Sequence, residues 1–347
     1  MSKINLSLLF FAVSLGLLSC GGSPSSASGG KPLWVDNLNS VYNRLQYVAA
    51  VGYASDRQMA ERSALSNLSS FFGQSIQSDQ TIRNTYFEAA RSGAMTQWFD
   101  STDVDYSIRT TTSMDILIGA EIRETWYDER NRVYYAAAVM DRQRTIQIYT
   151  NMISDNLRMI NNLVNAAKEE GNSLEAVSRY RFAGAAADIN TDYANILNVL
   201  GASPPAGVTT GDQYRLEALN IARVIPIGII VTGDRSARIQ NAFAKIFNDF
   251  GFRTGTSNPH YVLYVNVSIT NPEYPNTQYQ WAQMELNASL TDPAGADAVL
   301  LPFTLSIREG HNTTSLAENR AFLTAEQKIE SDYKELLSSY MNQLFPK

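Results

Sequence analysis

The sequence predicts an α+β fold, with two small α+β modules joined by an antiparallel helical hairpin. Short segments typical of strands lie on both sides of a long central stretch with helical periodicity. That stretch ends in a segment rich in Pro and Gly, residues 201–211, which marks an internal boundary. The chain has 347 residues, enough to bury two such cores.

The first residues of the chain have the pattern of a secretory signal. Lys3 is followed by an apolar run that is too short to span a membrane stably. The run ends in Leu17-Leu18-Ser19-Cys20, and Cys20 is the only cysteine of the chain. This ending resembles the lipobox of bacterial lipoproteins, whose cysteine receives lipid, including palmitate, and becomes the new N-terminus. We therefore predict residues 1–19 as signal peptide and Cys20 as the lipid attachment site.

A tether follows the predicted anchor. Residues 20–30 consist of Cys20 and then only Gly, Ser, Pro and Ala, so they cannot form a packed core. Gly21 and Gly22 are not acidic, which favours sorting to the bacterial outer membrane. We expect a protein held at that membrane by its lipid, in the periplasmic leaflet or at the cell surface.

The first module is expected over residues 31–145. Asp56 is a plausible N-cap for its first long helix, and residues 128–131 are expected to form the turn of a hairpin. The expected elements are a strand at 47–53, helices at 56–78 and 85–99, an extended segment at 104–114, and a hairpin at 116–139.

The same residues carry a family resemblance. The motifs are Pro32-x-Trp34, Val51-Gly52-x-Ala54, an Ala-rich helix with Ala60 and Ala64, and a strand ending Ala137-Ala138-Val139-Met140-Asp141. This region resembles the Helicobacter-type membrane-associated lipoprotein family, the "Lpp-twenty" type. The resemblance implies a compact α+β domain at the membrane and no agreed activity.

The central stretch is expected to form the hairpin over residues 146–200. An apolar stripe of residues three and four apart runs through 142–170. Gly171-Asn172 ends this helix, and Ser173 caps a second one. We expect residues 201–211 to be a linker at which the chain divides into two independently folding pieces.

The second module is expected over residues 212–347. Strands are predicted at 224–231, 261–270, 279–291 and 299–308, with a helix at 236–250 that Asp234 caps. The last helix is expected to bury Phe322, Ala325, Ile329, Tyr333, Leu336, Tyr340 and Leu344. The order resembles the N-terminal region of TolB and curli-secretion-type lipoproteins, which implies a small α/β domain.

The sequence offers little chemistry. The formal net charge of −6 disfavours nucleic acid as a partner. Only two histidines exist, His260 and His311, and Gly-x-Ser-x-Gly and P-loop motifs are absent. The nearby acid pairs, Asp103 with Asp105 and Glu121 with Glu124, lack calcium-loop spacing. We therefore expect no enzyme activity, no metal site and no cofactor.

Aromatic residues give the sharper hypothesis. Tyr274, Tyr279 and Trp281 surround a predicted strand end, where binding loops are common. Packing within the sheet is the default interpretation of these rings, and a surface that contacts a sugar or a peptide is the sharper alternative, so the small-molecule ligand is unknown at this point. We expect a non-enzymatic binding or scaffold component of an outer-membrane or flagellum-associated assembly, with envelope proteins as partners. The alternative is an oligomeric secretion or pore component of the outer membrane.

Overall fold

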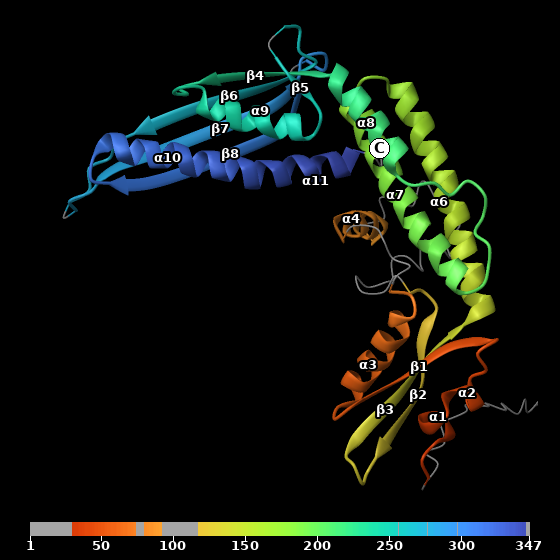
Figure 1. Cartoon of the computed structure of the whole chain (residues 1–347). Coiled ribbons are helices and arrows are strands. Elements are labelled where there is room, and N and C mark those ends of the chain that lie inside the picture. The colour runs from red at the N-terminus through yellow and green to blue at the C-terminus, as the bar shows by residue number, and fades with distance from the viewer. Residues whose placement is uncertain are drawn as a thin grey trace, which may run out of the picture.

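The computed structural model describes residues 30–73, 80–91, 117–255, 257–275, 277–296 and 298–344. The fold is α+β, and its parts form an arch (Figure 1). Two antiparallel helices, α6 (Arg142–Glu170) and α7 (Leu174–Val199), make a column with a β-sheet module near each end. The predicted Cys20 and residues 104–114 lie outside the described residues, as do the ends of the two helices expected at 56–78 and 85–99.

The N-terminal module is a three-stranded antiparallel sheet covered on both faces. Its strands are β1 (Tyr47–Ala54), β2 (Ala120–Asp128) and β3 (Val133–Asp141), in the order β1-β3-β2. Helix α3 (Arg57–Ser70) packs on one face, and the short helices α1 (Leu33–Asp36) and α2 (Leu38–Val41) pack on the other. Asp56 caps α3, since its Oδ1 accepts a hydrogen bond from Met59 N at 3.0 Å. The predicted strands and cap are confirmed.

Gly52 lets α3 approach the sheet closely. A Cβ at this position would lie 2.0 Å from Ala64 N and 2.6 Å from Ala60 O. Both alanines are fully buried. Small residues on the helix and on the strand therefore allow backbone to pack against backbone.

The helical column is organised by local caps and by a buried face. Asp141 Oδ1 accepts from Arg144 N at 2.9 Å at the start of α6, and Ser173 Oγ accepts from Ala176 N at 3.0 Å at the start of α7. Gly171, with φ of 65°, ends α6. Helix α4 (Gln80–Arg91) packs against α7 on the concave side of the arch (Figure 1).

Residues 201–211 contain no helix or strand and lead to α8 (Asp212–Val224), a helix that was not predicted. A Cβ at Gly211 would lie 2.2 Å from Gly184 O, so the end of this segment lies directly on α7. Helix α8 continues along α7 and buries Ala218 and Ala222.

The C-terminal module is a five-stranded mixed sheet in the order β5-β4-β6-β7-β8. Its strands are β4 (Pro226–Thr232), β5 (Arg253–Thr254), β6 (Tyr261–Thr270), β7 (Gln280–Asp292) and β8 (Ala298–His311). β4 runs parallel to β5 and β6, and the other pairs are antiparallel. One face is covered by α9 (Arg238–Asp249), α10 (Thr314–Lys328), the π-helical turn η2 (Ile329–Tyr333) and α11 (Lys334–Leu344).

Helix α10 packs on the apolar face of β7, and α9 packs on β4. Two details differ from the sequence expectations. Helix α9 begins only at Arg238, after the left-handed Ala237, so Asp234 caps it from upstream, and its Oδ2 accepts from Gln240 N at 3.0 Å. The π-turn adds a residue to the last helix, which moves the buried positions from Leu336 and Tyr340 to Leu337 and Met341.

The tip of the column belongs to the same core as the C-terminal sheet. Leu174, Val177 and Tyr180 of α7 join that core. The Tyr261 hydroxyl is 3.3 Å from Leu174 N, which donates to it, and Ser178 Oγ donates to the carbonyl of Met341. Within the described ranges, no helix has both the length and the apolar character that membrane crossing requires.

Candidate functional site

An aromatic corner forms where β6 ends and β7 begins. The rings of Tyr274 and Trp281 meet edge to face with their centroids 5.5 Å apart. The guanidinium of Arg308, on β8, lies 5.2 Å from the centre of the Tyr274 ring. Trp281 pairs with Gly310 across the sheet, where a Cβ would come within 3.2 Å of the indole. The corner is therefore a packed assembly of cation, phenol and indole.

The three residues singled out from the sequence have different environments. Tyr274 and Trp281 are brought together and are half-buried, whereas Tyr279 stays 47% exposed in the loop before β7. The indole Nε1 of Trp281 is buried, and the described residues give it no hydrogen-bond partner. The exposed Tyr279 ring is the part of this set that is free to contact another molecule.

The sheet face opposite α9–α11 is mostly polar, and no helix among the described residues covers it. Its exposed residues include Asn266, Ser268, Glu285, Asn287, Thr304 and Ser306. Hydrogen bonds from Ser306 Oγ at 2.7 Å and Gln283 Nε2 at 3.2 Å lower the pKa of Glu285. Ile230 and Tyr264 are neighbours on this face, at 44% and 45% exposure. A polar face with exposed rings is suited to reversible contacts.

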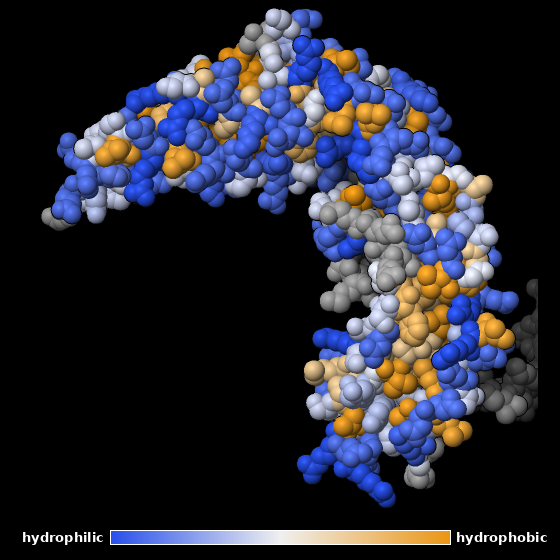
Figure 2. Space-filling model, in the orientation of Figure 1, coloured by the Kyte–Doolittle hydropathy of each residue, from blue (hydrophilic) through white to orange (hydrophobic). Residues whose placement is uncertain are grey.

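The surface of the C-terminal module on its helical side is more hydrophilic than the lower part of the arch. Figure 2 shows mainly hydrophilic residues over α9–α11, with hydrophobic ones scattered among them. More hydrophobic residues gather over the lower column and the N-terminal sheet. The exposed residues of that sheet include Tyr53, at 68%.

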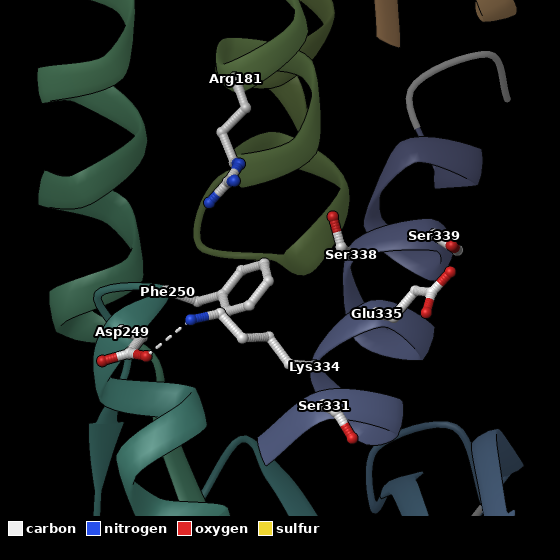
Figure 3. A pocket seen from close by; sticks show the side chains of 8 residues that line it. All are labelled: Arg181, Asp249, Phe250, Ser331, Lys334, Glu335, Ser338 and Ser339. Atoms are coloured by element: carbon white, nitrogen blue, oxygen red, sulfur yellow. Dashed lines mark hydrogen bonds and ion pairs between the residues drawn. The ribbon is translucent and has the colours of Figure 1, made fainter. Parts of the chain in front are cut away.

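A crevice of about 480 Å³ lies where α7, α9 and α11 meet. Figure 3 shows Arg181 reaching into it from α7, above Phe250. The Arg181 guanidinium lies 4.9 Å from the centre of the Phe250 ring. Lys334 also lines the crevice, and its Nζ is 3.0 Å from Asp249 Oδ2.

A second cavity of about 300 Å³ adjoins this crevice and shares Arg181, Phe250 and Ser338 with it. Its walls come from α4, α7, α8 and α11. The apolar part of the lining consists of Ile82, Val177, Phe182, Ala185, Ala218 and Leu219. Sequence reasoning missed both the crevice and the cavity, because their lining residues come from helices that are far apart in the sequence.

The other residues considered for chemistry are far apart or engaged. His260 precedes β6 and His311 ends β8, at opposite ends of the sheet and about 40 Å apart along the strands. Glu121 pairs with Arg123 at 2.5 Å, and Glu124 accepts from the Tyr42 hydroxyl at 2.7 Å. Asp103 and Asp105 lie outside the described residues. The described part of the chain contains no cluster of three or more His, Cys, Asp or Glu residues suited to a metal ion.

No family model and no curated protein matches the chain. Among solved structures it is similar to the secreted protein HP1454 from Helicobacter pylori, at 14% identity and a TM-score of 0.39, over 82% of this chain and 97% of that one. It is also similar to a minor lipoprotein from Acinetobacter baumannii, at 11% identity and a TM-score of 0.26, over 35% of this chain and 94% of that one. A third similar structure is rare lipoprotein B from Shewanella oneidensis, at 13% identity and a TM-score of 0.23, over 33% of this chain and 92% of that one. These values are too low for a functional argument to rest on them.

Proposed function

We propose that this protein is a non-enzymatic, lipid-anchored component of the bacterial cell envelope that works by binding other envelope proteins. The observation that carries the proposal is the sequence Leu17-Leu18-Ser19-Cys20 at the end of an apolar run. Lipid on Cys20 would hold the chain at a membrane, and the outer membrane is the proposed one because Gly21 and Gly22 are not acidic.

The architecture supports a scaffold role. A column of two helices separates the two sheet modules, so that each offers its own surface (Figure 1). The residues between Cys20 and the first helix would give the folded body reach from the membrane. A protein that connects partners benefits from two separated surfaces and from a flexible attachment.

The proposed contact surface lies at the aromatic corner and the adjoining uncovered sheet face. Tyr279 is its exposed ring, and the half-buried rings of Tyr274 and Trp281 pack against each other in the same corner. Exposed tyrosines on a rigid sheet bring a large contact area at a low cost in conformational entropy. The polar residues around them provide hydrogen-bonding groups for the rim of an interface.

Capture from membranes tests this proposal. Full-length protein is cross-linked in cells, extracted with detergent and compared with Tyr279→Ala, for which we expect at least a tenfold loss of the specific partner. The control is the double variant His260→Ala with His311→Ala, which should retain the partner. If the histidine variant loses the partner and Tyr279→Ala retains it, the contact surface lies elsewhere. Thermal unfolding of each variant separates loss of contact from loss of folding.

A further inference from the structure

Two hollows meet at Arg181 on the concave side of the arch. The crevice of about 480 Å³ and the cavity of about 300 Å³ lie side by side, and both open to solvent. Arg181, Phe250 and Ser338 line both. A molecule that occupies both therefore lies next to the Arg181 side chain.

Arg181 differs from the cations around it in having no anionic partner among the described residues. Lys334 pairs with Asp249, and Arg215 pairs with Asp188 at 2.5 Å and Asp212 at 2.7 Å. Within the part of the chain that the structure describes, the Arg181 guanidinium lies over the face of the Phe250 ring, at 4.9 Å from its centre. Loss of hydration lowers its pKa, although the side chain remains accessible to solvent. A positive charge that has lost part of its hydration favours the arrival of an anion.

The cavity of about 300 Å³, called the inner cavity below, has mainly apolar walls, in contrast to the charged Arg181. Ile82, Val177, Phe182 and Leu219 present hydrocarbon to it. Its volume is at the lower end of the range for small-molecule sites, about 300–1,000 Å³. An apolar hollow that ends at an unpaired cation selects a molecule with one anionic end and one short apolar end.

We propose that this site binds an anionic amphiphile, whose carboxylate or phosphate group meets Arg181 and whose hydrocarbon part enters the cavity between α4, α7, α8 and α11. The hydroxyl of Ser338, which lines both hollows, offers a further hydrogen bond to the anionic group. The inference does not depend on the proposed scaffold function. The same chemistry has two sources, a free fatty acid or a phosphate-bearing lipid.

Calorimetry on residues 21–347, which keep every described helix and strand, tests the proposal with defined probes. Decanoate represents the fatty acid, decyl phosphate the lipid phosphate, decanol the tail alone, and acetate and inorganic phosphate the head groups alone. All are used below the concentrations at which they form micelles. We expect saturable 1:1 binding of decanoate or decyl phosphate, and the tighter of the two identifies the source. Decanol and the head groups alone should bind at least tenfold more weakly.

Two variants and a control locate the site. Arg181→Gln should weaken the anionic probes at least tenfold and leave decanol unchanged. Leu219→Gln, at a position that is 38% exposed and so tolerant of change, should weaken every probe that carries a tail. Arg130→Gln removes one positive charge from an exposed turn and should bind as wild type. Unchanged thermal midpoints show that the variants fold.

Three results would overturn the proposal. The first is an absence of saturable binding to wild type by either anionic probe. The second is decanol binding as tightly as decanoate, which would mean that Arg181 selects nothing. The third is wild-type affinity in Arg181→Gln, in which case Arg181 only covers the Phe250 ring.

Discussion

The Tyr86 hydroxyl donates a 2.8 Å hydrogen bond to Asn156 Oδ1, which joins α4 to α6 across 70 positions of the sequence. Asn156 Nδ2 then donates to Asn190 Oδ1 of α7 at 2.8 Å. All three residues are buried. This short polar chain fixes the position of α4 on the column, and α4 forms one wall of the inner cavity.

Asn156→Ala should therefore lower the free energy of unfolding by about 2–3 kcal/mol, because it leaves Asn190 and Tyr86 buried with fewer partners. Urea unfolding of the full chain measures the change. The matched control is Asn162→Ala on the exposed side of the same helix, for which we expect a change within about 0.5 kcal/mol. Equal effects of the two substitutions would show that the polar chain does not stabilise the fold.

Gly52→Ala should destabilise the N-terminal module by about 3 kcal/mol, since the added methyl group would collide with the α3 backbone at Ala60 and Ala64. Thermal unfolding provides the measurement. Gly73→Ala serves as control, because a Cβ there meets its nearest atom only at 3.6 Å. A wild-type midpoint in Gly52→Ala would mean that α3 is not held against β1 as described.

Alkaline pH should unfold the protein through its buried tyrosines. Burial raises the pKa of Tyr149 and Tyr333, and it raises the pKa of Tyr340 to about 12. In the unfolded chain the tyrosine hydroxyls ionise at about pH 10. The unfolded state therefore loses protons first, so stability is complete below about pH 10 and falls between about pH 10 and 12.

Thermal midpoints measured across this pH range test the expectation, with tyrosine ionisation followed by absorbance. Tyr333→Phe is the informative variant, because the buried Tyr333 hydroxyl has no hydrogen-bond partner among the described residues. It should be as stable as wild type at pH 7 and lose less stability near pH 11. A midpoint that does not change up to pH 12 would contradict the account.

Residues 212–347 alone should unfold cooperatively, but at a lower temperature than the full chain. The sheet and α9–α11 share one core, but Leu174, Val177 and Tyr180 of α7 complete it in the full chain. Differential scanning calorimetry on this piece, expressed alone, measures whether it has a cooperative transition and at which temperature. A piece without a cooperative transition would show that α7 is indispensable to the second core.

The sequence predicted the bounds of helices and strands best where a regular apolar pattern ran over many residues. The stripe through residues 142–170 matches the bounds of α6, and the predicted strand at 261–270 matches β6. Helix α8 was missed because alanines, Ala218 and Ala222, form its buried face, while Leu216 is 54% exposed. Its apolar pattern therefore does not mark the side that packs.

Tertiary effects explain the remaining differences. The π-turn in the last helix shifts the buried face by one residue, and no residue type in Ile329–Tyr333 signals it. The sequence placed Tyr274 and Trp281 near the same strand end, since seven positions separate them, but their ring contact comes from the structure. The surroundings of Arg181 could not be predicted, because Phe250 and Ser338 are far from it in the sequence.

The most direct test of the central claim is the chemical state of Cys20 in protein from bacterial membranes. Mass spectrometry of the N-terminal peptide, together with radiolabelled fatty acid, should show a chain that begins at Cys20 and carries lipid. Cys20→Ala should take up no label and leave a precursor that retains residues 1–19. Label in Cys20→Ala, or a wild-type chain whose cysteine is unmodified, would contradict the lipid-anchored envelope account.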